Sequence, residues 1–140
     1  MKPPDAAKSD LVRQWLAKAD EDLGLARHIL QTDAPFLNAA AFHAQQAAEK
    51  YLKAFLVWLQ VPFPKTHDLE ILLKLIAARN PSLAESLEDA VQITDYGVEV
   101  RYPGDVPPLS LEEASNAVAI ADKTHQAVAT ALKEAAYSFS

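Results

Sequence analysis

The stretch AAAFHAQQAAEKYLKAFLVWL, residues 39–59, decides the fold of this 140-residue chain. It contains no glycine or proline and consists mostly of residues that favour an α-helix. When the stretch is wound at about 100° per residue, the apolar side chains fill one broad side. They are Ala44, Ala47, Ala48, Tyr51, Leu52, Ala54, Phe55, Leu56, Trp58 and Leu59. A stripe of this width is typical of a central helix that packs on more than one neighbour.

The other side of this helix is polar, and we call it the polar strip. Its members are His43, Gln45, Gln46, Glu49, Lys50 and Lys53, with Phe42 and Val57 as apolar interruptions. The strip places hydrogen-bond donors, an acceptor and a titratable imidazole on a rigid helix. It is the first candidate for a binding surface.

Helices are also predicted on both sides of the central one. The first begins near Ser9, a good N-cap, and runs to about Gln31. Its apolar positions recur with the spacing of a bundle helix, at Val12, Leu16, Ala19, Leu23, Ala26 and Leu30. Pro62 and Pro64 end the central helix, because neither can continue it.

The remaining helices are predicted from their capping residues. Thr66 is the expected cap of a short third helix, and Asn80 with Pro81 begins a fourth, long helix. The fourth helix ends between Gly97 and Pro103. Ser110 and Glu113 form a capping box for the last helix, whose apolar positions are Ala114, Val118, Ala121, His125, Val128, Leu132 and Ala135. The sequence thus predicts an all-α, up-and-down antiparallel bundle of about five helices, four long and one short, in a single domain over residues 1–140.

Composition narrows the function. The chain has no cysteine, so it has neither a disulfide framework nor a thiolate nucleophile. A net charge of −6 argues against binding nucleic acid over the whole surface. The longest apolar run, residues 54–59, is far shorter than the ~20 residues of a membrane span. The N-terminus lacks the apolar core of a signal peptide, so a cytoplasmic location and no membrane attachment are expected.

The common catalytic motifs are absent. The sequence has no glycine-rich phosphate loop, no H-E-x-x-H and no G-x-S-x-G. Its four histidines, at 28, 43, 67 and 125, do not have the spacing of metal ligands. Neither a metal nor a cofactor is expected. His67, at a helix start, is interpreted as a capping residue, with catalysis as the alternative. His125, on the apolar stripe of the last helix, is interpreted as a core or interface residue rather than a ligand.

The segment from Asp95 to Pro103, DYGVEVRYP, is the strongest candidate site. Arg101 offers a planar fork for phosphate, and Tyr102 or Tyr96 offers a face on which a base or ribose stacks. His43, Lys50 and Lys53 would add charge if they face the same space. The structural alternative is that Arg101 pairs with a carboxylate or caps a helix, that the tyrosines pack beneath the loop, and that the lysines are solvated.

Four blocks of the sequence resemble a known family. They are AKADEDLxxAR (17–27), AAFHAQQAAEKYLKAFL (40–56), PKTHDL (64–69) and RYP (101–103). In this order they resemble the HEPN domain family, a name that stands for higher eukaryotes and prokaryotes nucleotide-binding. The resemblance implies a helical bundle that commonly forms a homodimer, and in many prokaryotic cases a minimal nucleotidyltransferase partner.

The resemblance implies one of two functions. Some members of the family are metal-independent ribonucleases that act as toxins, and others bind nucleotides without cleaving RNA. The nuclease branch uses an arginine followed after four to six residues by histidine. Arg101 matches that arginine, but positions 106, 107 and 108 are valine and two prolines, and the next histidine is His125. We therefore expect a non-enzymatic subunit that binds a nucleotide and pairs with a nucleotidyltransferase in a toxin–antitoxin-like system. An endoribonuclease toxin and a purely structural interaction subunit are the alternatives.

Overall fold

The structure, a computed structural model, describes residues 4–33, 35–97 and 108–139, and these are helical with no strand among them. The α-helices are α1 (Pro4–Leu30), α2 (Leu37–Leu59), α3 (Leu69–Ala77), α4 (Pro81–Ser86) and α5 (Leu111–Glu134). A 3₁₀ helix, η1 (Glu88–Gly97), precedes the last of them. The predicted all-α bundle is confirmed.

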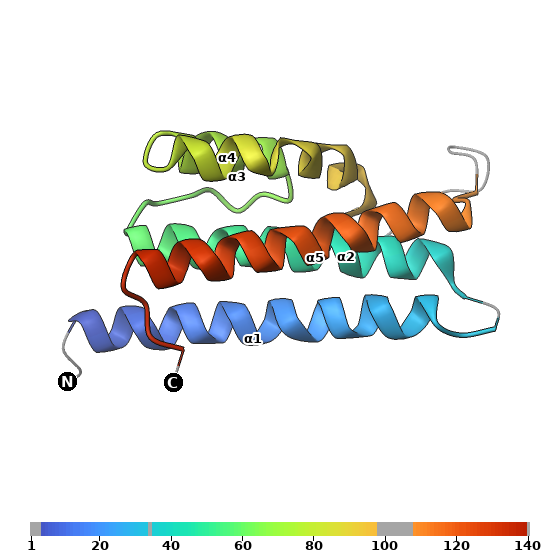
Figure 1. Cartoon of the computed structure of the whole chain (residues 1–140), viewed down its shortest axis with the longest axis horizontal. Coiled ribbons are helices and arrows are strands. Elements are labelled where there is room, and N and C mark those ends of the chain that lie inside the picture. The colour runs from blue at the N-terminus through green and yellow to red at the C-terminus, as the bar shows by residue number, and fades with distance from the viewer. Residues whose placement is uncertain (1–3, 34, 98–107, 140) are drawn as a thin grey trace.

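Helix α2 is the centre of the bundle. Figure 1 shows α1, α2 and α5 as three long rods, with the shorter α3, α4 and η1 in a layer across α2 and α5 from α1. Helix α1 runs antiparallel to α2 and α5, because the α3–η1 layer returns the chain to the end of the bundle where α2 began. Helix α2 packs against α1, α5, α3 and η1, so it is covered on more than one side, as the width of its apolar stripe predicts.

Alanines allow this close packing. Six alanines of α2 are fully buried, namely Ala40, Ala41, Ala44, Ala47, Ala48 and Ala54. Alanine is the best helix former and its short side chain lets two helix backbones approach each other. Three members of the polar strip, Gln45, Glu49 and Lys53, are buried in the interior as well.

Two helix starts differ from the prediction. Helix α1 begins at Pro4 rather than Ser9, since proline is accepted in the first turn of a helix. The cap of α3 is Asp68 rather than Thr66: Asp68 Oδ1 accepts from the Glu70 N–H at 2.9 Å. The Thr66 hydroxyl instead accepts from the Asp68 N–H at 3.0 Å, so it holds the turn before the helix.

The fourth helix is divided. Asn80 caps it as predicted, its Oδ1 accepting from the Leu83 N–H at 3.1 Å, but α4 stops at Ser86 and the chain continues as η1. The β-branched residues of η1 favour an α-helix poorly. In addition, Thr94 Oγ1 accepts from the Leu69 N–H at 3.2 Å, which ties η1 to the start of α3. By contrast, the capping box of Ser110 and Glu113 is formed as predicted, with both hydrogen bonds at 3.0 Å.

No helix among the described residues is both long enough and apolar enough to cross a membrane.

Tyr51 joins the three long helices. Its hydroxyl donates to Asp20 Oδ1 of α1 at 2.5 Å, and its ring stacks on His125 of α5 with centroids 4.9 Å apart. Burial, and then the hydrogen bond to Asp20 and the negative charge of that carboxylate, raise the pKa of the Tyr51 phenol well above its ordinary value. The folded protein therefore keeps this proton where an unfolded chain loses it.

Tyr51→Phe should make the protein less sensitive to alkali. Above about pH 10 the unfolded chain loses the phenolic proton that the folded state retains, so this group lowers the free energy of unfolding by up to about 1.4 kcal/mol per pH unit. Below that pH its contribution is fully present. Urea unfolding from pH 7 to 11.5 should show a shallower alkaline slope for Tyr51→Phe than for wild type. Tyr137→Phe, which keeps Tyr51, is the control, and equal slopes in wild type and Tyr51→Phe would contradict the assignment.

Candidate functional site

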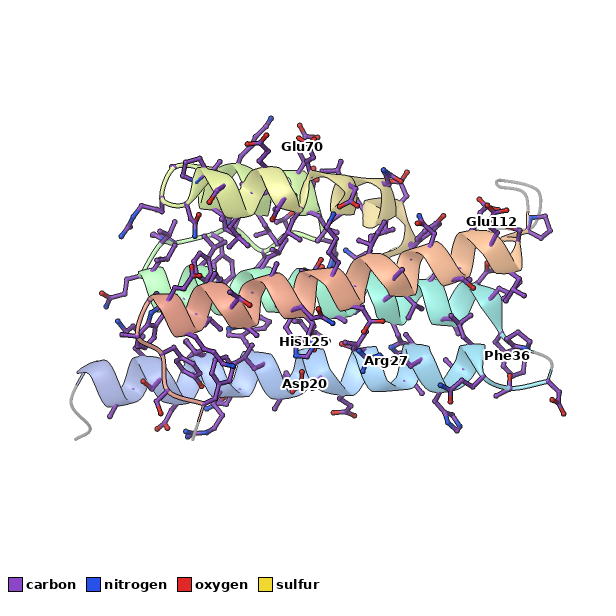
Figure 2. The ribbon with its side chains drawn as sticks, in the orientation of Figure 1. Asp20, Arg27, Phe36, Glu70, Glu112 and His125 are labelled. Carbon is purple, nitrogen blue, oxygen red and sulfur yellow. The ribbon has the colours of Figure 1, made fainter. Side chains whose placement is uncertain are left out.

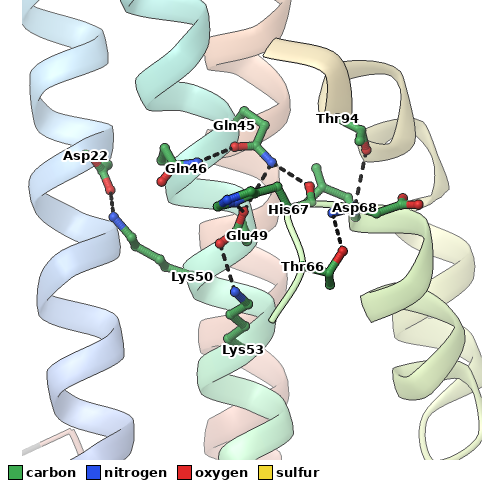
Figure 3. A network of polar contacts seen from close by, with 11 residues as sticks. Asp22, Gln45, Gln46, Glu49, Lys50, Lys53, Thr66, His67, Asp68 and Thr94 are labelled. Atoms are coloured by element: carbon green, nitrogen blue, oxygen red, sulfur yellow. Dashed lines mark hydrogen bonds and ion pairs between the residues drawn. The ribbon is translucent and has the colours of Figure 1, made fainter. Parts of the chain in front are cut away.

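The polar strip of α2 separates into two groups of contacts. The first group faces α1, where Asp22 is shared by two residues of the strip. His43 Nδ1 lies 2.9 Å from Asp22 Oδ1. Lys50 donates to Asp22 Oδ2, a contact that Figure 3 shows. Both side chains are partly exposed. His43 and Lys50 thus lie together on the α1–α2 face, and each already has a carboxylate partner.

The second group centres on Glu49, whose side chain is only 4 % exposed. Its Oε2 accepts from Lys53 Nζ at 2.9 Å, and its Oε1 lies 2.8 Å from His67 Nδ1. Gln45 Nε2 lies 3.4 Å from the same Oε1 and donates to the His67 carbonyl oxygen at 2.9 Å. We call Gln45, Glu49, Lys53 and His67 the Glu49 network (Figure 3).

Helical spacing assembles the network. Gln45, Glu49 and Lys53 are four residues apart, so they lie on one face of α2. A buried carboxylate is costly unless it is paired and hydrogen-bonded, and Lys53 meets that need. Lys53 was expected on an open polar strip, but its side chain is about nine-tenths buried. Its ammonium lies 5.6 Å and 5.7 Å from the ring centroids of Trp15 and Phe63.

His67 differs from the rest of the network because its side chain is 70 % exposed. An ionised carboxylate can only accept a hydrogen bond, so Nδ1 carries a proton when it bonds Glu49. The second ring nitrogen, Nε2, then accepts in the neutral imidazole and donates in the imidazolium. Among the described residues no partner contacts Nε2. The buried carboxylate therefore presents this nitrogen at the surface in one orientation.

The end of η1 packs against the same network. Gly97 is buried, and a Cβ added to it would lie 2.6 Å from Gln45 Oε1. Tyr96 is partly buried and packs on the hydrophobic core. Arg101 and Tyr102 lie outside the described residues. Of the predicted site residues, the structure thus brings His43 and Lys50 together at Asp22, encloses Lys53 and packs Tyr96 on the hydrophobic core.

Sequence reasoning missed the roles of Glu49 and His67. Glu49 was one more member of the polar strip, and His67 was interpreted as a capping residue. The four-residue spacing of Gln45, Glu49 and Lys53 was a visible signal of one shared face. The contact between Glu49 and His67 was not visible, because it depends on the path of the loop from 60 to 68. His125 does contact the core as expected, through its stacking on Tyr51.

Gly97→Ala should destabilise the protein by about 1–3 kcal/mol, since the new methyl group would overlap the side chain of Gln45, whose hydrogen bonds hold it in place. Gln45→Ala removes that obstacle, so the double variant should be more stable than the sum of the two single effects. Gly24→Ala is the matched control, because a Cβ there meets nothing within 4 Å in α1, and it should stabilise by about 1 kcal/mol. Urea unfolding measures all four. Strict additivity at Gly97 and Gln45 would show that the two do not interact.

One of the comparisons with known proteins identifies a family. A family model described as the HEPN domain matches residues 12–134. No curated protein matches the chain. A solved structure, that of TT1696 from Thermus thermophilus, is similar at 27 % sequence identity with a TM-score of 0.63. The similarity covers 85 % of this chain and 96 % of that one. Because the family model spans most of the chain and the helical bundle has a solved counterpart, the chain belongs to the HEPN domain family.

Proposed function

We propose that this HEPN protein binds a nucleotide or a nucleotide-bearing ligand beside the Glu49 network. It would act as a cytoplasmic homodimer and pair with a minimal nucleotidyltransferase in a toxin–antitoxin-like system. The observation that carries the ligand proposal is the exposed imidazole of His67, held at Nδ1 by a carboxylate that is itself buried. The family resemblance supports the partner and the homodimer.

The chemistry of the network suits a phosphate group. When His67 is protonated, Nδ1 donates to Glu49 and Nε2 donates outward, which is the charge-assisted hydrogen bond that phosphate oxygens accept best. Glu49 holds the ring in place through its hydrogen bond to Nδ1. Because Gln45 also holds the His67 carbonyl oxygen, the loop that carries the imidazole is fixed at two points. The imidazole therefore loses little conformational freedom when a ligand binds, which lowers the entropic cost of binding.

Arg101 and Tyr102 remain part of the proposal. The segment that carries them follows directly after Gly97, which packs on Gln45 of the network. In the proposed site the guanidinium of Arg101 binds phosphate, and Tyr102 or Tyr96 stacks on the base. His43 and Lys50 would take part only by exchanging Asp22 for the ligand. Lys53 would act indirectly, by holding the side chain of Glu49 in place through its hydrogen bond to Oε2.

Calorimetry with ATP tests the ligand proposal. Wild type should bind, and His67→Ala and Arg101→Ala should each bind about 10-fold more weakly or worse, since a hydrogen bond to a charged group contributes about 1.5–3 kcal/mol. Lys74→Ala is the control, because Lys74 is exposed on α3 and pairs with Glu70. Equal affinities in all variants, or no binding by wild type, would refute the proposal. No binding, combined with co-purification of a nucleotidyltransferase that neither substitution affects, would instead favour a purely structural interaction subunit.

A second candidate function is the metal-independent endoribonuclease, and the pair of Glu49 and His67 is the observation that favours it. A histidine held by a carboxylate is a suitable general base. Neutral Nε2 would accept the proton of a ribose 2′-hydroxyl as that oxygen attacks the adjacent phosphorus and the 5′-oxygen leaves. His67 would thereby take the place of the histidine that does not follow Arg101 in the expected window.

Cleavage of single-stranded RNA in the presence of EDTA tests this second function. His67→Gln should lower the rate at least 100-fold, which is the usual contribution of a general base. Glu49→Gln should lower the rate and shift its dependence on pH, because the base loses the carboxylate that orients it. A thermal melt of each variant, with Lys74→Ala as the control, separates these effects from unfolding. RNA that stays intact with the folded wild-type protein would exclude the activity.

A further inference from the structure

A cavity of about 250 Å³ lies on another side of α2, between α1, α5 and the C-terminal residues. None of the residues of the Glu49 network lines it. Figure 2 shows Asp20 of α1 and His125 of α5 facing each other across the gap between these helices. Arg13 of α1 and the C-terminal residues Tyr137, Ser138 and Phe139 complete its polar and aromatic lining. The cavity is thus a separate feature from the proposed nucleotide site.

The C-terminal residues form one wall of the cavity because they are pinned to the bundle. Ala136 adopts a left-handed conformation, with φ of 70°, and the Tyr137 N–H donates to the Leu132 carbonyl at 2.9 Å. Trp58 Nε1 donates to the Ala135 carbonyl at 3.0 Å. The ring of Tyr137 packs edge-on against Trp58 and Phe139, with centroids 5.3 Å and 4.8 Å away. Two aromatic rings are therefore held at one end of the cavity.

Asp20 is the negative group of the cavity, and the buried hydroxyl of Tyr51 orients it. Tyr51 donates to Oδ1 at 2.5 Å, and His125 Nε2 lies 3.9 Å from the same oxygen. Because the pKa of Tyr51 is raised, the phenol keeps the proton that it donates to the carboxylate. Among the described residues no lysine or arginine pairs with Asp20. The aspartate is 61 % exposed, so a ligand in the cavity can reach it.

The positive group of the cavity is already neutralised. Arg13 donates to Asp10, on the side of Arg13 that lies away from Asp20 along α1. Arg13 and Asp20 are seven residues apart, which is about 10 Å along a helix. The Asp20 end of the cavity therefore presents a carboxylate that, among the described residues, has no lysine or arginine partner and lies beside the imidazole of His125. An anionic ligand would have to displace Asp10 from Arg13 before it could bind. A cationic ligand would displace no arginine or lysine from Asp20.

We propose that this cavity binds a small organic ammonium ion, a primary amine on an aromatic or apolar stem. The ammonium group donates to Asp20, and the stem packs on Phe139 and Tyr137. A carboxylate beside aromatic faces is the combination that recognises ammonium groups. The ring of Phe139 already attracts one, since Lys133 Nζ lies 5.7 Å from its centroid. The net charge of −6 also attracts cations to the protein.

Titration calorimetry with benzylamine tests the proposal, with benzyl alcohol as the neutral analogue and benzoate as the anionic one. The titrations are run at pH 8. Benzylamine should bind saturably, and both analogues should bind at least 10-fold more weakly. Asp20→Asn should lower the affinity for benzylamine at least 10-fold. Glu21→Gln, which removes the next carboxylate of α1 without touching the cavity lining, should leave it unchanged.

Three results would overturn the proposal: no saturable binding of benzylamine, binding of benzoate as tight as that of benzylamine, or equal affinity in Asp20→Asn. The asparagine still accepts from the Tyr51 hydroxyl, and a thermal melt checks that the variant folds. Phe139→Ala is a second, independent variant, since Phe139 is about half exposed and its truncation leaves the core intact. It should weaken benzylamine binding while the charge of Asp20 is unchanged.

Discussion

The burial of α2 on several sides is the constraint on which the structure depends. A helix packed between α1, α5 and the α3–η1 layer cannot bury a polar side chain that lacks a partner without a large cost in free energy. Its buried members Gln45, Glu49 and Lys53 must therefore satisfy one another or find partners in the layer above. Glu49 does both, since it accepts from Lys53 and bonds His67. The path of the loop from 60 to 68 and the close approach of Gly97 follow from that requirement.

The same helix organises both proposed sites. Glu49 and Tyr51 are two residues apart, which is about 200° around a helix, so they point to nearly opposite sides of α2. Glu49 orients the exposed imidazole of His67 on one side. On the other side Tyr51 orients the carboxylate of Asp20. In each case a buried side chain of α2 orients an exposed side chain of a neighbouring segment through a hydrogen bond. Binding sites are precise when buried residues hold the exposed ones in position in this way.

The helices were predictable where the signal is local. The capping box of Ser110 and the cap at Asn80 use side chains that bond backbone a few residues away, so the sequence pattern is sufficient. The division of the fourth helix was not predicted, because its apolar spacing suits an α-helix and the competing contact, from Thr94 to Leu69, joins residues far apart in sequence. The cap of α3 was misplaced by two residues, since Thr66 and Asp68 are both good capping residues.

By itself the sequence determined that the chain is helical, that residues 39–59 form its central helix, that no cysteine chemistry is available, and that its motifs resemble the HEPN family. Only the tertiary structure decided which polar residues of that helix meet solvent. The side chain of Lys53 is buried, and Lys50 forms an ion pair with Asp22 of α1. The exposed side chain of the Glu49 network is that of His67, which comes from a loop. The physical reason is that helical periodicity sets the direction of each side chain around its own axis. What covers that direction depends on how distant segments pack, and neither spacing nor composition specifies that.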